Sequence, residues 1–181
     1  LLIGLAIKRL FIGKLAAGAH SVFSLNYFRW LYSNKILQAV VKPFQAYFIG
    51  TPALNVVYRL FGARIGRGVV IYTKEVFTEP ELVTIEDGVL IEEECKVSCS
   101  SVGDGELLLH PVRIGHGARA RPYCAVGRGA YLPPGHELVA TGCLVGYGGK
   151  ADGLVTGGKV SKLKLGAADP PRQEPCLRLF V

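Results

Sequence analysis

Apolar residues recur at every sixth position through the middle of the chain. The longest run starts at Ile114 and ends at Leu144, and every intermediate member is apolar: Ala120, Val126, Leu132 and Leu138. Two shorter runs precede it, namely Ile65, Ile71 and Phe77, followed by Ile85, Ile91 and Val97. An amphipathic helix requires a period of about 3.6 residues and a half-buried strand a period of two, so neither element explains this spacing.

A period of six fits a triangular solenoid, in which each short, flat side points one aliphatic residue inward. Small or apolar residues also recur four positions after these anchors: Val69, Val89, Cys95, Ala118, Cys124 and Ala130. We therefore predict an all-β left-handed parallel β-helix of hexapeptide repeats over residues 63–147. Its coils are expected at 63–79, 83–98 and 112–145.

Two interruptions break the period of six. Two extra residues stand around Glu79-Pro80-Glu81, and a longer insertion occupies residues 98–111. We expect the longer insertion to be an irregular loop that protrudes from the solenoid, a position that often carries function in repeat proteins.

Residues 1–62 form an apolar zone with scattered basic residues, and we expect it to be helical and membrane-associated. The segment 1–11 is too short to span a bilayer alone, although it could be the end of a transmembrane helix with Lys8 on its cytoplasmic flank. Residues 24–48 suit either a helix on the membrane surface or one packed on the soluble domain. Pro43 is expected to kink or divide that helix. Thr51-Pro52 should start a short helix that Gly62 ends.

Composition narrows the possible partners. The net charge of +7 and the 50% hydrophobic content suit anionic lipid or an acidic partner. No nucleic-acid-binding motif is present.

The five cysteines lack metal-binding spacing, so we expect reduced thiols and no metal site. Residues 148–181 are expected to form a partly irregular tail. The chain begins with Leu and contains no Met, so we expect it to be a fragment of a longer protein.

Several motifs stand together in a specific order. Gly50-Thr51-Pro52 is followed by Leu60-Phe61-Gly62, then by Leu-Val-x-Ile-x-Asp-Gly at 82–88 and Pro-Val-x-Ile-Gly at 111–115. Over about residues 5–147 this order resembles the C-terminal domain of poly-lysine-synthetase-type nonribosomal peptide synthetases, within the hexapeptide-repeat acyltransferase superfamily.

The resemblance implies an acyltransferase-like unit of a membrane-bound protein. Such a unit transfers an (amino)acyl group from a carrier thioester to an amine. The implied donor is carried on phosphopantetheine, or on CoA, and no cofactor is bound directly. The implied partners are a carrier-protein domain, membrane lipid on the cytosolic face and a possible second copy of the chain.

The chain departs from the family where the general base is expected, because Ser100 stands at the position of the family's histidine. The remaining candidates for the base are His110, at the end of the insertion, and His116, two residues after an inward Ile. Either could equally be an ordinary surface histidine. His20 and His136 receive no catalytic role, and Cys99 is a weaker candidate for a nucleophile.

Three functions remain open from the sequence. The first is the acyltransferase-like unit. The second is a non-catalytic β-helix that serves as a scaffold or oligomerisation module, which the loss of the histidine favours. The third, weaker one is an acyl-CoA-dependent acyltransferase that forms a soluble trimer.

Overall fold

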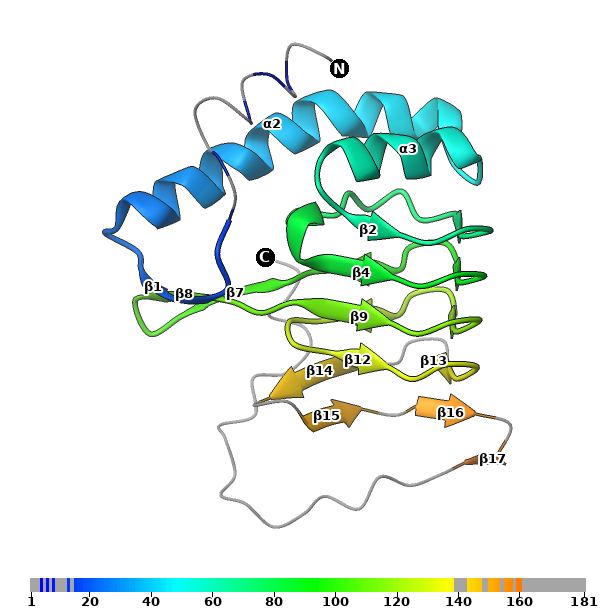
Figure 1. The fold of residues 1–181 in the computed structure, drawn as a ribbon. Helices are drawn as coiled ribbons and strands as arrows, with labels where there is room; N and C mark the ends of the chain where they lie inside the picture. Colours follow the sequence, from blue (N-terminus) through cyan, green and yellow to red (C-terminus); the bar gives the residue numbers. More distant parts are fainter. Residues whose placement is uncertain are drawn as a thin grey trace.

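The structure is a computed structural model that describes residues 15–138 continuously. Before this stretch it describes Gly4, Ala6, Lys8 and Gly13, and after it the backbone of the short strands between residues 143 and 160. The described part is mostly β-structure, built as a stack of parallel strands with two α-helices lying across one end (Figure 1).

The parallel strands of the described residues form three sheets. The first contains β2 (Arg64–Ile65), β4 (Val83–Ile85), β9 (Val112–Ile114) and β12 (Tyr131–Leu132). The second contains β3 (Val70–Ile71), β5 (Leu90–Ile91), β10 (Arg119–Ala120) and β13 (Glu137–Leu138). The third contains β6 (Lys96–Val97), β11 (Ala125–Val126) and β14 (Cys143–Tyr147). The chain visits the three sheets in constant rotation, so each circuit stacks on the previous one.

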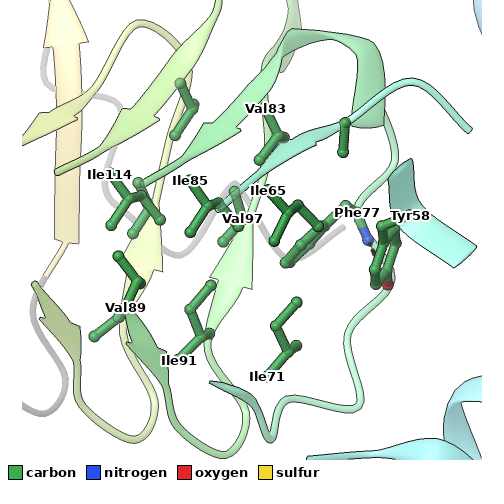
Figure 2. Packing of buried hydrophobic residues seen from close by; sticks show 14 of the residues in the cluster. Tyr58, Ile65, Ile71, Phe77, Val83, Ile85, Val89, Ile91, Val97 and Ile114 are labelled. Atoms are coloured by element: carbon green, nitrogen blue, oxygen red, sulfur yellow. Dashed lines mark hydrogen bonds between the residues drawn. The ribbon is translucent and has the colours of Figure 1, made fainter. Parts of the chain in front are cut away.

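The strand register confirms the predicted inward positions. Ile65 pairs with Ile85, which pairs with Ile114, which pairs with Leu132. Figure 2 shows Ile65, Ile85 and Ile114 in one row along the inside of the stack, with Ile71 and Ile91 in a second row. No anchor between Ile65 and Leu138 is more than 8% exposed, and the intervening small residues, Cys95 and Cys124 included, are buried as well. The period of six therefore reports one inward residue for each side of the stack.

Helix α2 (Leu25–Phe48) and helix α3 (Pro52–Leu60) cover one end of the stack (Figure 1). The side chain of Ser24 caps α2 by accepting a hydrogen bond from the amide of Tyr27. Of the two effects expected at Pro43, a kink or a division, the division is wrong, since the helix runs through this residue. Val41 and Gln45, on either side of Pro43, are buried against the stack, and this packing outweighs the missing backbone hydrogen bond.

Helix α3 begins and ends as predicted. Thr51 is its N-cap residue and Pro52 its first residue, although the Thr51 hydroxyl donates to the carbonyl of Phe48 instead of capping the helix. After the last helical residue, Leu60, the chain turns at Gly62, whose φ of 105° favours glycine.

Polar side chains of the two helices bind the backbone carbonyls at the open end of the first circuit. Gln45 donates to Thr73 O at 2.5 Å, and Asn55 donates to Val69 O at 2.7 Å. Arg59 donates to the carbonyls of Ile65 and Gly66. These carbonyls have no further strand to pair with, so the helices supply the donors that the next strand would have supplied. We call this end of the stack the helix-capped edge.

The insertion at 98–111 is not an irregular loop. Its residues form a hairpin of β7 (Ser100–Gly103) and β8 (Glu106–Leu109), and β1 (Gly18–Ser21) pairs with β8 to make an antiparallel sheet of three strands. Asp104 and Gly105 make the tight turn, both with positive φ. Asp-Gly is a strong signal for such a turn. The strand β1 also corrects the expectation that residues 1–62 are entirely helical.

Two expectations concern the chain ends. Within the part of the chain that the structure describes, no helix combines the length and the apolar character needed to cross a bilayer. The expected irregular tail at 148–181 lies largely outside the described residues. The exceptions are the backbones of β15 (Lys150–Gly153), β16 (Val155–Gly157) and β17 (Lys159–Val160), which pair antiparallel at the far end of the stack.

Candidate functional site

The N-terminal half of α2 lies over the antiparallel sheet of β1, β8 and β7 (Figure 1). Residues paired across antiparallel strands project from the same face of a sheet. The register pairs His20 with Leu107, and both Gly18 and Ser100 with Leu109. Leu107 and Leu109 are fully buried, so this face points inward, beneath α2. We call the layer between this face and α2 the seam.

A buried carboxylate, that of Glu79, holds one side of the seam together. Glu79 is 1% exposed and accepts hydrogen bonds from three donors. The donors are the indole Nε1 of Trp30 at 2.7 Å, the hydroxyl of Thr78 at 2.6 Å and the backbone amide of Cys99 at 3.1 Å. The carboxylate therefore ties α2 to the base of the hairpin, and the bonds to it are of the strong, charge-assisted kind.

The buried amine of Lys8 binds residues close to Glu79 in the sequence and to the end of α3. Lys8 is 2% exposed and makes an ion pair with Glu81 at 3.4 Å, while its Nζ donates to the carbonyl of Phe61. Burial lowers the pKa of the Lys8 amine, and the carboxylate of Glu81 acts against this shift. Lys8 thus packs against the protein, where the sequence suggested that it would flank a membrane.

A small pocket opens on the other side of the seam. It is lined by Leu15, Ala16, His20, Asn26, Arg29 and Leu109. The His20 ring bridges two of these groups, with Nε2 at 3.1 Å from the carbonyl of Ala16 and Nδ1 at 3.2 Å from the amide nitrogen of Asn26. A histidine that the sequence placed in a helix thus lies on a strand and lines a pocket.

Ser100 and His110 lie on neighbouring strands at the base of the hairpin, but Ser100 pairs with Leu109, so the side chain of His110, the next residue, projects from the opposite face. Ser100 is 9% exposed, and its carbonyl accepts a hydrogen bond from the hydroxyl of Ser98. His110 follows β8, donates its backbone amide to Cys99 O at 2.9 Å, and exposes its side chain. Its ring is therefore reachable by a substrate, whereas the hydroxyl of Ser100 is nearly inaccessible.

His116 lies apart from these two residues. It is exposed at the turn after β9, one side of the stack away from His110, and its backbone amide donates to the carboxylate of Glu86 at 2.9 Å. Ser100 and His110 therefore belong to the base of the same hairpin with their side chains on opposite faces, and His116 lies at the next corner.

The thiol of Cys99 is not placed for catalysis. Cys99 is fully buried, and burial raises its pKa above the ordinary thiol value. Since the thiolate is the nucleophilic form, this residue has neither the charge nor the access that a nucleophile needs.

The sequence contains signals for some residues of the seam and none for others. Glu79 stands in the interruption at 79–81, and an acidic residue between apolar runs marks the place where the repeat meets another element. Trp30 is the single tryptophan. No sequence signal links His20 to the hairpin, because β1 pairs with residues more than 80 positions away. Across residues 15–138 and the described positions before them, no three His, Cys, Asp or Glu side chains converge in a way that could hold a metal ion.

Comparison with known proteins relates the chain to a poly-amino-acid synthetase. No family model matches the chain. Over 113 residues the chain is 31% identical to the Delta-poly-L-ornithine synthetase of Acinetobacter baumannii (strain AB307-0294). The aligned part is 62% of this chain but 8% of that protein, so the chain spans only a small share of the relative's length. The chain is therefore distantly related to a poly-amino-acid synthetase.

Proposed function

We propose that this chain is an acyltransferase-like unit of a larger, membrane-bound peptide-synthetase-type protein, and that it transfers an (amino)acyl group from a carrier thioester to an amine. The sequence relation to a protein named for making poly-L-ornithine carries the proposal. The rotation of the chain through three parallel sheets supports a hexapeptide-repeat β-helix, for which we propose the left-handed winding usual in this superfamily.

The reaction requires few groups from the protein. The amine nitrogen attacks the thioester carbonyl carbon, a C–N bond forms, the C–S bond breaks, and the carrier thiol leaves. The amine must lose a proton, and the carbonyl oxygen gains negative charge on the way. We assign the proton transfer to His110, whose exposed ring lies at the base of the hairpin beside the strand that carries Ser100. The leaving thiolate then takes up the proton.

The proposal includes a carrier-protein domain as donor and the cytosolic face of a membrane as location. Several large apolar side chains are exposed in and just before α2: Phe23, Leu25, Phe28, Tyr32 and Tyr47. Arg29, Lys35 and Lys42 lie among them and are exposed too. Aromatic and basic residues on one helix are typical of a surface that rests on anionic lipid.

Transfer from an aminoacyl thioester on a carrier domain to an added amine tests the proposal. We expect His110→Ala to lower the rate of amide formation about 10²- to 10⁴-fold, as loss of a general base does. His136→Ala is the matched control, since that ring bonds its own neighbouring Pro134 carbonyl. Mass spectrometry of the amide and titration of the released thiol give the rate. An unchanged rate in His110→Ala would exclude His110, and a loss confined to His116→Ala would transfer the role to His116.

One observation favours a second function, a non-catalytic scaffold. Ser100 stands where the resemblance places a histidine, and its hydroxyl is nearly buried. The imidazole of His110 is exposed to solvent. A scaffold would bind the carrier domain without turnover, whereas turnover with an acyl-CoA and none with the carrier would indicate the CoA-dependent alternative.

A further inference from the structure

We propose that the pocket formed by His20, Asn26 and Arg29 binds a small carboxylate, the α-carboxylate of an amino acid or short peptide. The pocket lies between the first turns of α2 and strand β1, where the seam opens to solvent. None of its polar residues belongs to the group proposed for proton transfer.

The hydrogen bonds around His20 fix its tautomer. The carbonyl of Ala16 can only accept, so the His20 Nε2 beside it carries the proton and donates. In the neutral ring Nδ1 is then an acceptor and takes a hydrogen from the amide nitrogen of Asn26. The acceptor groups of this bridge are thus already occupied by donors.

Donors, by contrast, remain in excess. The Asn26 amide nitrogen carries two hydrogens and gives one to His20, which leaves the second for a ligand. The Arg29 guanidinium carries five N–H groups, enough to hold a protein partner and an anion together. A pocket with surplus donors and a fixed positive charge selects an anion.

The surroundings favour a carboxylate of small size. The pocket volume is about 70 Å³, and a site needs about 10–15 Å³ to hold one water, so several waters or one carboxylate group fit. The planar guanidinium fork matches the two oxygens of a carboxylate. Leu15 and Leu109, both buried, form the apolar part of the lining.

The backbone also approaches the guanidinium closely. A Cβ placed on Gly13 would come within 2.7 Å of the Arg29 Nη2 atom, and Gly13 has a positive φ of 67°. The positive φ favours glycine at this position, and the guanidinium of Arg29 lies beside the backbone of Gly13. The naming of an amino acid as the ligand rests on the proposed function, whereas the preference for a carboxylate rests on the pocket alone.

Titration of the full chain with acetate, glycine, glycinamide and inorganic phosphate tests the proposal. Trp30, the single tryptophan, follows Arg29 directly and lies four residues after Asn26, so its fluorescence reports on this part of α2. We expect a saturable change with acetate and glycine and none with glycinamide. Arg29→Gln should weaken binding about tenfold or more, the usual effect of losing a charged hydrogen bond. Arg119→Gln, an exposed arginine on β10, is the matched control.

Three results would overturn the assignment. They are the absence of a saturable response, wild-type affinity in Arg29→Gln, and binding of phosphate without binding of acetate or glycine, which would point to a phosphate-bearing ligand. If Arg29→Gln does not fold by circular dichroism, Asn26→Leu replaces it, because that change keeps the charge and removes the amide donor. Acetate binding requires neither a carrier domain nor acyl transfer. The binding proposal can therefore hold where the proposed function fails, and the proposed function can hold where the binding proposal fails.

Discussion

The parallel stack and the seam differ in the kind of group that they bury, since the stack buries apolar side chains and the seam buries polar ones as well. The inside of the stack contains aliphatic side chains in rows (Figure 2), together with small residues and cysteines, and its period of six is interrupted at residues 79–81 and 98–111. The seam contains a buried carboxylate, a half-buried threonine and a half-buried tryptophan that donate to it and, close by, a buried amine. The stack gains its stability from apolar area removed from water, which does not depend on direction. The seam depends on a few directional bonds, and directional bonds are what a binding or catalytic site needs.

The largest effect is expected from an inward residue of the stack. Ile91 is fully buried and pairs in register with Ile71 and Ala120. Ile91→Ala should lower the free energy of unfolding by about 2–5 kcal/mol, because the rigid neighbours leave a cavity. Urea denaturation followed by circular dichroism measures the loss. Leu90→Ala, on the outward side of the same strand, is the control and should cost far less; equal losses would contradict the inward ladder.

A somewhat smaller effect is expected in the seam. Glu79→Ala leaves the donors of Trp30, Thr78 and Cys99 without their acceptor, and we expect a loss of about 2–3 kcal/mol in unfolding free energy. The emission of Trp30 should shift to the red as water reaches the indole, and it should not shift in Ile91→Ala. Glu93→Ala, at an exposed corner, should change neither quantity. Unaltered Trp30 emission in Glu79→Ala would show that the carboxylate does not organise the seam.

The smallest effect is expected on the outer surface of the stack, away from its apolar inside and from the seam. The hydrogen bond from Arg113 lowers the pKa of the Glu86 carboxyl, with a further contribution from the backbone amide of His116. Since the folded pKa lies below the unfolded one, the stabilisation is present above about pH 4.3, the ordinary value for Glu, and is lost as the pH falls through the folded pKa.

Glu86→Gln should therefore be slightly less stable than the wild type at pH 7 and equal to it once the wild-type carboxyl is protonated. Urea midpoints measured at several pH values, with Glu106→Gln as an exposed control, give the comparison. A difference that persists unchanged at low pH would show that the charge of Glu86 contributes nothing.

The stack could be predicted from the sequence because its rule is local and repeated. Each inward position follows the previous one by six residues, so residues such as Ile114 and Leu132 are identified without knowledge of the rest of the chain. The short helix at Pro52–Leu60 followed from its start and stop signals in the same way. Asp104-Gly105 is a local signal for the turn of the hairpin, whereas the break in the period of six shows only where the repeat stops.

The seam could not be predicted in the same way. His20 reaches the hairpin only because β1 pairs with β8, and no short-range pattern encodes a pairing over such a separation. Glu79 becomes a buried acceptor only when α2 brings Trp30 over it. Residue type and position in the repeat point to His110 and His116, and neither property says which side chains surround them.

The helix-capped edge has a consequence for how the stack behaves toward other molecules. A row of free carbonyls on the edge strand of a parallel sheet is a template to which any extended chain can add, including a second stack. Gln45, Asn55 and Arg59 occupy that row from the helices. Growth of the sheet at this end is therefore blocked by three side chains that belong to no repeat, and a stack without them would be prone to end-to-end fibre formation.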